Sequence, residues 1–248
     1  MKVSIITAVY NRVDTLTDTI ESVLSQTYPD IEYILIDGMS SDGTHQIVQR
    51  YRDRIDQSIR EKDRGIYDAL NKGIRLAQGD IVGLLHADDF FTGPHVIQRI
   101  VKEFSKEPGT MGTYGDLNYV DSKNTGQTIR RWVALDYQLP KFRWGWMPPH
   151  PTVYLRRECY QKHGLFRDDF RFAADYELLV RMMVFHRVPM RYIPETLVNM
   201  RVGGLSNASL SNRLKANRED ARAWVVNGMR VPFGLRWLKP LRKLGQYF

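Results

Sequence analysis

The chain has 248 residues, 43% of them hydrophobic, and a formal net charge of +8. This length and composition predict one globular α/β domain with a large core and a short appendage. The single cysteine, Cys159, excludes a disulfide within the chain, and no Cys/His spacing typical of a zinc site is present. No apolar run approaches the ~20 residues of a transmembrane helix. Met1 and Lys2 lead directly into an apolar segment, so we expect no signal peptide and a cytoplasmic location.

The first 44 residues predict a β-α-β unit. Residues 3–10 form a continuous apolar run rich in β-branched side chains, which is typical of a central strand covered on both faces. Residues 13–24 repeat apolar side chains at helical spacing. A second apolar strand, 31–36, ends at Asp37, which opens a Gly/Ser/Asp-rich loop over 37–44. Open α/β sheets bind their ligands at this end of the strands.

The loop over 37–44 indicates a mononucleotide site. Asp37 and the glycines around it suit hydrogen bonding to a base or a ribose with close backbone approach. The alternative is a helix N-cap, which fits Asp42 better than Asp37. The loop lacks both the Gly-x-Gly-x-x-Gly pattern and the Gly-Lys-Ser/Thr ending, so it resembles neither a dinucleotide fingerprint nor a Walker A loop.

Two adjacent carboxylates follow the apolar run over 84–87. Asp88 and Asp89 repel each other and lose hydration at the end of a buried strand, unless they share a cation. The sequence therefore predicts a metal-diphosphate site here.

The loop over 144–151 carries further candidate contacts. Trp144 and Trp146 present flat faces suited to stacking on a sugar, and the alternative is that they fill the apolar underside of a lid. His150 lies between two prolines, which favour an extended backbone. It is a candidate contact for a diphosphate or an acceptor, or else a buried, hydrogen-bonded histidine.

Four motifs in this order resemble the family-2 glycosyltransferases of the GT-A fold, and the likeness covers roughly residues 1–200. They span residues 4–11, 37–44, 61–73 and 86–89. The nearest likeness is to small bacterial transferases of exopolysaccharide, capsule and colanic-acid assembly. The resemblance implies a Rossmann-like, mostly parallel central sheet flanked by helices. We expect a catalytic domain over 1–204 and a basic helical extension over 205–248.

The resemblance also assigns roles at the donor site. The nucleoside contacts are expected from Thr7, Ala8, Tyr10, Asp37, Asp63 and Arg64. Asn71 and Gly73 match a helix packed beneath them. Asp88 and Asp89 match the family's Asp-x-Asp region, which binds a divalent cation, Mg²⁺ or Mn²⁺, that bridges the diphosphate. His86 stands where many members carry Asp or Asn. On family grounds we expect UDP rather than GDP as the nucleotide.

Residues 172–181 resemble the family's Glu-Asp-x-x-Leu-x-x-Arg signature, with Ala174 in place of the Glu. Asp175 then corresponds to the catalytic base, although a carboxylate in the first turn of a helix is also ordinary. A base there implies inverting, metal-dependent transfer of one sugar from a nucleoside-diphosphate sugar to a glycan or lipid-linked hydroxyl. His86 and Ala174, at positions that are usually acidic, leave a second hypothesis, a non-catalytic nucleotide-sugar-binding or scaffold subunit.

The C-terminal region carries the whole charge excess. Residues 201–248 hold ten Lys and Arg against Glu219 and Asp220. Arg201, at a strand end, is a candidate phosphate contact or a solvated arginine. From Pro232 onward, Phe, Trp and Leu oppose Arg and Lys on a helix, which predicts docking on an anionic inner membrane. The alternative is packing on the catalytic domain or on a second subunit. No nucleic-acid reader motif is present, so we expect no nucleic-acid partner.

Overall fold

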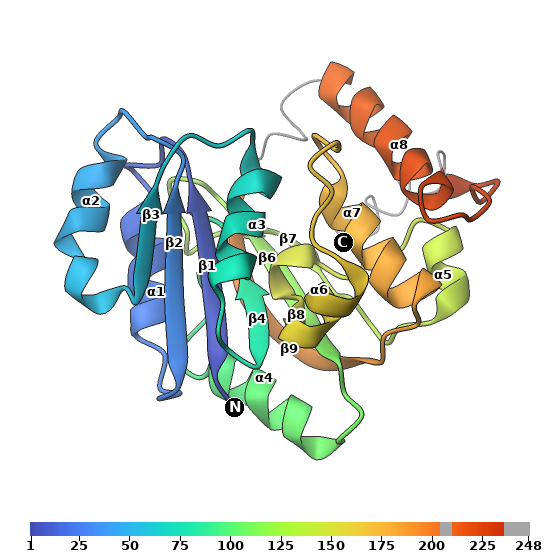
Figure 1. Cartoon of the computed structure of the whole chain (residues 1–248), viewed down its shortest axis with the longest axis horizontal. Helices are drawn as coiled ribbons and strands as arrows, with labels where there is room; N and C mark the ends of the chain where they lie inside the picture. The colour runs from blue at the N-terminus through green and yellow to red at the C-terminus, as the bar shows by residue number, and fades with distance from the viewer. Residues whose placement is uncertain (204–209, 236–248) are drawn as a thin grey trace.

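Figure 1 shows the computed structural model, which describes residues 1–203 and 210–235. A mixed nine-stranded sheet has the order β3-β2-β1-β4-β8-β6-β9-β5, with β7 paired to β6. The strands are β1 (Val3–Val9), β2 (Ile31–Asp37), β3 (Gln57–Arg60), β4 (Ile81–Leu84), β5 (Asp89–Phe91), β6 (Gly112–Val120), β7 (Thr128–Trp132), β8 (Tyr154–Arg156) and β9 (Met190–Arg201).

Helices cover both faces of the sheet (Figure 1). They are α1 (Leu16–Leu24), α2 (Thr44–Arg50), α3 (Ile66–Leu76), α4 (Val96–Lys106), α5 (Leu139–Arg143), α6 (Arg157–His163), α7 (Ala174–Leu179) and α8 (Leu210–Val225). Three short segments complete the list: the 3₁₀ turns η1 (Arg52–Arg54) and η2 (His150–Thr152), and the π-helical segment η3 (Val180–Phe185). No helix in the described part of the chain combines the length and the apolar character needed to cross a bilayer.

The predicted β-α-β unit is confirmed. β1 is buried along its whole length and pairs in parallel with β2 on one side and β4 on the other. Because successive side chains of a strand point to opposite faces, Ile5 and Ile6 enter two separate cores. The parallel arrangement holds for the four strands β3, β2, β1 and β4. Beyond them β8 runs antiparallel to both β4 and β6, so the sheet is mixed.

Helix α3 lies close against β1. A Cβ atom added at Gly73 would overlap the Ile6 side chain, so only glycine allows this approach. Two residues earlier, the Asn71 amide accepts the Phe166 N–H at 2.9 Å and donates to the Phe166 carbonyl at 2.8 Å. These contacts fix the helix carrying Asn71 and Gly73 against β1 and against the segment that follows α6.

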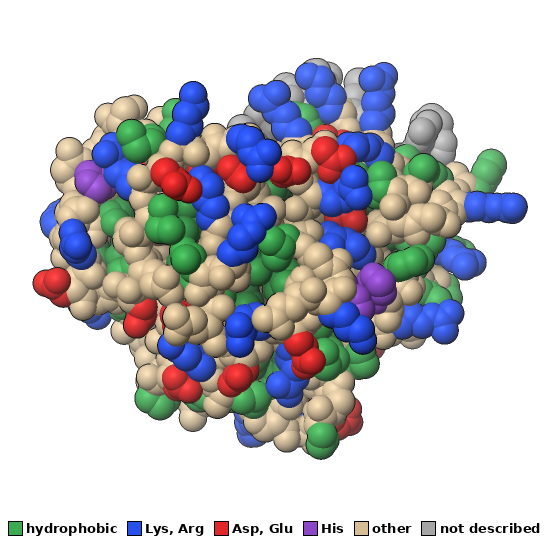
Figure 2. All heavy atoms as spheres, in the orientation of Figure 1, with side chains coloured by type: hydrophobic (Ala, Val, Ile, Leu, Met, Phe, Trp, Pro, Cys, Tyr) green, Lys and Arg blue, Asp and Glu red, His purple; other side chains and the backbone are tan. Residues whose placement is uncertain are grey.

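Helix α8 packs on α7. The Trp224 indole N–H donates to the Tyr176 hydroxyl at 3.1 Å, and the Asn227 side chain donates to Glu177 at 3.0 Å. Helix α8 lies within the predicted basic extension, and Figure 2 shows Lys and Arg side chains gathered over it. The boundary predicted between residues 204 and 205, and the amphipathic pattern from residue 236 onward, lie outside the described residues.

Candidate active site

The carboxyl ends of β1 and β2 bring several predicted nucleotide residues together. Asp37, buried at the end of β2, accepts the Ser40 N–H at 2.9 Å, and its other oxygen lies 3.2 Å from the Arg60 Nε. Asp42 accepts the N–H and the hydroxyl of Thr44, the first residue of α2. The N-cap of α2 is Gly43, so neither Asp42 nor Asp37 is the N-cap, and Asp42 binds the first helical residue from one position before the cap.

Gly38 marks the point where three segments meet. A Cβ atom added there would lie 2.7 Å from an Asp63 carboxylate oxygen and 3.5 Å from the Tyr10 ring. The Tyr10 side chain is 61% exposed. Burial raises the pKa of Asp63, and Lys72, whose Nζ lies 2.5 Å from the carboxylate, partly offsets this. Tyr10, Gly38 and Asp63 thus form one open surface that can receive a base or a ribose.

Three other predicted nucleotide residues lie differently. Thr7 and Ala8 are buried within β1, and the Thr7 hydroxyl accepts a hydrogen bond from Tyr33 at 3.2 Å. Arg64 is exposed and forms ion pairs with Asp68 at 2.9 Å and Asp168 at 2.7 Å. The Arg64 guanidinium is therefore already neutralised by carboxylates.

Asp88 and Asp89 occupy contrasting environments. The Asp88 side chain is 32% exposed, and its carboxylate lies 3.7 Å from the Arg12 Nε. Asp89 is buried at the start of β5, and its Oδ1 has no hydrogen-bond partner. Burial raises the pKa of Asp89 well above its usual range, and the charge of Asp88 raises it further. Arg201 donates to the Asp88 carbonyl at 2.8 Å and pairs with Asp18, so Arg201 holds this loop from the buried side.

A hard cation requires oxygen ligands, and the candidates here are the side chains of Asp88 and Asp89. Within the described ranges, no cluster of three or more His, Cys, Asp or Glu residues is placed to hold a metal ion. Mg²⁺ is commonly bound by one or two carboxylates while substrate phosphates and water complete its shell. The partly exposed Asp88 carboxylate fits that kind of site, and the buried Asp89 Oδ1, which has no hydrogen-bond partner, would have to leave the protein interior to join it.

A chain of hydrogen-bonding groups surrounds Asp175. One carboxylate oxygen lies 3.1 Å from the His150 Nδ1, and the other accepts the Tyr67 hydroxyl at 3.4 Å. The His150 Nε2 in turn lies 3.3 Å from the His86 Nε2. The structure thus connects the predicted base, through two imidazoles, to the strand that leads into Asp88.

The backbone at His150 differs from the extended conformation that the prolines predict. His150 begins the 3₁₀ turn η2, which is closed by hydrogen bonds from the Thr152 N–H and hydroxyl to the Pro149 carbonyl. The Thr152 hydroxyl also accepts from Gly115 on β6. This turn directs the His150 side chain to Asp175.

The two tryptophans have separate roles. Trp146 is buried, donates to the Ala134 carbonyl at 2.8 Å and packs edge-on against Phe142, so the lid-underside alternative is correct for it. Trp144 is exposed and lines an open cavity that Trp146 does not line. Likewise, Arg201 is buried, so the solvated alternative was wrong for that residue.

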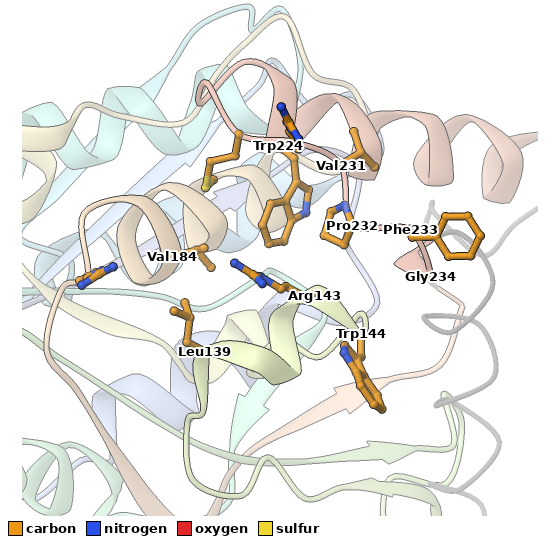
Figure 3. A pocket seen from close by; sticks show the side chains of 12 residues that line it. Leu139, Arg143, Trp144, Val184, Trp224, Val231, Pro232, Phe233 and Gly234 are labelled. Atoms are coloured by element: carbon orange, nitrogen blue, oxygen red, sulfur yellow. The ribbon is translucent and has the colours of Figure 1, made fainter.

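Figure 3 shows the cavity that Trp144 lines, an open groove of about 650 Å³ between α5, the end of η3 and the chain after α8. Arg143, Arg187 and Arg230 line it, and none of the three has an ion-pair partner in the described part of the chain. Phe233, also at the groove, is fully exposed. The groove is therefore cationic and partly aromatic.

Sequence reasoning missed three residues of the site. Arg12 approaches Asp88 and no sequence pattern marked it, whereas Tyr67, which approaches Asp175, lies in the 61–73 motif but was given no role there. The third is Glu219 of α8, which accepts the backbone N–H groups of three consecutive residues just before α7. They are Arg171 at 3.0 Å, Phe172 at 2.8 Å and Ala173 at 2.8 Å. Its one available signal was that Glu219 and its neighbour Asp220 are acids in an otherwise basic region.

The chain belongs to glycosyl transferase family 2, whose model matches residues 4–165. It is 34% identical over 188 residues to an uncharacterized glycosyltransferase of Mycobacterium tuberculosis, covering 72% of this chain and 68% of that protein. It is 27% identical over 208 residues to a PGL/p-HBAD biosynthesis glycosyltransferase of Mycobacterium bovis, covering 82% and 78%.

Solved structures share the fold. Staphylococcus aureus TarS 1-349 in complex with UDP superposes with a TM-score of 0.69 at 18% identity, over 91% of this chain and 66% of TarS 1-349. The mannosyltransferase PcManGT of Pyrobaculum calidifontis, in complex with GDP-Man and Mn²⁺, gives 0.66 at 18% identity over 98% and 69%. The α/β GT-A fold is confirmed.

Proposed function

We propose that the protein transfers one sugar from a nucleoside-diphosphate sugar to a hydroxyl of a glycan or lipid-linked acceptor in bacterial surface-polysaccharide synthesis. The observation that carries this proposal is the contact chain from Asp175 through His150 to His86. It supports a role for Asp175 as a base beside the strand that leads into Asp88. The proposed base for the acceptor and the proposed carboxylates for the donor diphosphate would then belong to one site.

The chemistry follows from these positions. Asp175 takes the proton of the acceptor hydroxyl while the acceptor oxygen forms a bond to the anomeric carbon of the sugar. At the same time the bond between that carbon and the nucleoside diphosphate breaks. A single displacement of this kind inverts the configuration. When bound by Asp88 and Asp89, a divalent cation neutralises charge on the leaving phosphates. Arg12, beside Asp88, adds a positive charge at the same place.

Tyr10, Gly38 and Asp63 are the proposed nucleoside contacts. We expect UDP rather than GDP as the nucleotide, as the resemblance implies. The complexes of structural relatives support a nucleotide sugar of either kind, because TarS was crystallised with UDP-GlcNAc and PcManGT with GDP-Man.

The test is nucleoside-diphosphate release from UDP-, GDP- and dTDP-sugars with Mn²⁺, Mg²⁺ or EDTA. Asp175→Asn should lower kcat by about 10²- to 10⁴-fold and leave donor affinity by calorimetry unchanged. Asp88→Ala should weaken metal-dependent donor binding, and Asp53→Asn, on an exposed turn away from the site, serves as the control. Donor binding without turnover, even with membrane extract as acceptor, would favour the alternative of a nucleotide-sugar-binding subunit.

We also propose that the protein docks peripherally on an anionic inner-membrane surface. Support comes from the groove with Arg143, Arg187 and Arg230, where the exposed Trp144 and Phe233 suit the interfacial region of a bilayer. Each cation near an anionic surface contributes on the order of 1 kcal/mol.

Vesicle co-sedimentation tests this docking. Wild type should bind phosphatidylglycerol vesicles more than phosphatidylcholine vesicles, and replacing the three groove arginines with Gln should remove most of the difference. The control replaces Arg50, Arg52 and Arg54, exposed arginines at the opposite end of the molecule (Figure 1). Equal binding to both lipids would refute docking, and loss only on deleting residues 236–248 would refute the groove's role.

A further inference from the structure

We infer that His150 is a positioning residue for Asp175, and that His86 fixes His150 in the tautomer this role requires. The inference rests on the proposed function, in which Asp175 is the base. Position 86 opens the family's metal-binding motif, and in this chain it belongs to the hydrogen-bond network of the base instead.

The proton positions follow from the donors and acceptors present. An ionised Asp175 only accepts hydrogen bonds, so the His150 Nδ1, 3.1 Å away, carries the proton that is donated. A neutral imidazole has one N–H, which leaves the His150 Nε2 as an acceptor. The His86 Nε2, at 3.3 Å, must then be the donor.

The far side of His86 agrees with this assignment. Donation from Nε2 leaves the His86 Nδ1 as a lone pair, and that atom is buried without a hydrogen-bond partner. A buried acceptor without a partner is tolerated better than a buried N–H without one. The opposite arrangement would bury an unsatisfied donor.

The same geometry explains why histidine suits position 86. A carboxylate there would only accept, so it would draw a proton onto the His150 Nε2 and leave an imidazolium between two carboxylates. A cation beside Asp175 would favour the ionised carboxylate and make it a weaker base. His86 donates instead, so it draws no second proton onto the His150 Nε2. An asparagine amide can donate in the same way.

His86 is also poorly placed to bind a cation. Its Nε2 faces His150 and its Nδ1 is buried, so neither nitrogen offers a lone pair to the cleft.

Long-range ¹H–¹⁵N spectra of the histidine side chains test the network on the full chain, without nucleotide or metal. His150→Gln and His86→Asn assign the signals. His186→Asn is the control, because His186 stacks on His163 elsewhere at a centroid distance of 3.9 Å. We expect His150 protonated on Nδ1 and His86 on Nε2 at pH 7.5. A proton on the His150 Nε2 would overturn the inference.

Turnover of the position-86 variants tests the consequence. We expect kcat to fall in the order His86→Asn, His86→Ala, His86→Asp, with the aspartate at least about tenfold below the asparagine and donor affinity similar in all three. Thermal melting shows whether each variant folds. If His86→Asp does not fold, His150→Gln replaces it in the test, and we expect that variant to have a reduced kcat and an unchanged donor affinity. Equal kcat for Asn and Asp would refute the role of His86. If wild type itself turns over no donor, the proposed function fails, whereas the spectra still decide the network.

Discussion

At the scale of single residues, Gly38 is the contact point of the proposed nucleotide surface. Gly38→Ala should force the Asp63 carboxylate away, because the added Cβ would lie 2.7 Å from it. Losing a hydrogen bond from the displaced carboxylate costs about 1.5–3 kcal/mol, roughly a 10- to 150-fold loss of nucleotide affinity. Calorimetry with the nucleoside diphosphate measures it.

A matched glycine provides the control for that substitution. A Cβ at Gly93 meets nothing within 4 Å, so Gly93→Ala should leave nucleotide affinity unchanged. Equal affinities of the two variants would mean that the nucleotide binds away from Gly38.

Asp116 on β6 predicts a pH dependence of stability. Burial raises its pKa, and hydrogen bonds from the Ala134 N–H and the Tyr192 hydroxyl only partly offset this. A carboxyl with a raised folded-state pKa keeps its proton while the unfolded chain releases it, so stability falls as pH rises above about 4. Both hydrogen bonds reach Oδ1, so Asp116→Asn can keep them without the charge.

Urea unfolding across pH measures this effect. The free energy of unfolding of Asp116→Asn, relative to wild type, should be flat below pH 4 and rise between pH 4 and pH 7. A constant difference over the whole range would show that Asp116 ionises alike in the folded and unfolded chains.

The local sequence pattern predicted the positions of some of these residues and not of others. Asp37 and Asp88 stand at strand ends that apolar runs mark in the sequence, so their positions were predictable. Asp175 required the family resemblance, because a carboxylate in a first helical turn is ordinary. The role of Glu219 could not be predicted, because it binds backbone groups 46 to 48 residues away and such contacts produce no local sequence pattern.

At the scale of elements, α8 holds the start of α7 through Glu219. Glu219→Ala removes the acceptor for three backbone N–H groups, and each unsatisfied donor costs about 1–3 kcal/mol where it is buried. We expect the melting temperature to drop by several degrees and kcat to fall, because Asp175 follows those groups directly. Differential scanning calorimetry and donor turnover measure the two effects.

Glu195→Ala is the matched control, because Glu195 forms an exposed ion pair with Arg99 at 2.6 Å. Such surface pairs contribute about 0–1 kcal/mol. If Glu195→Ala and Glu219→Ala destabilise the protein equally, α8 does not position α7.

The positions and pairing of some strands were likewise predictable from the sequence, and those of others were not. The type and the parallel pairing of β1 and β2 were predictable from sequence, because both strands are long and mostly apolar. β5 and β8 have three residues each, too short for any periodic signal, and their antiparallel pairing depends on distant partners. The mixed half of the sheet therefore emerged only in three dimensions.

At the scale of the whole molecule, α8 packs on α7 rather than standing apart. A chain ending at residue 204 would lose Trp224 from the core and leave the N–H groups before α7 without Glu219. We expect it to melt at a lower temperature and to show no turnover, while deletion of 236–248 alone preserves the melting temperature. Unchanged, cooperative melting of residues 1–204 would instead establish them as an independent domain.

The position of Glu219 also has a consequence for the order in which the protein matures during synthesis. Tyr10, Gly38, Asp63 and Asp88 all emerge from the ribosome within the first 90 residues. The turn before Asp175 gains its anchor only when Glu219 follows. A chain stalled or clipped before Glu219 would therefore lack the contact that holds the turn before the proposed base.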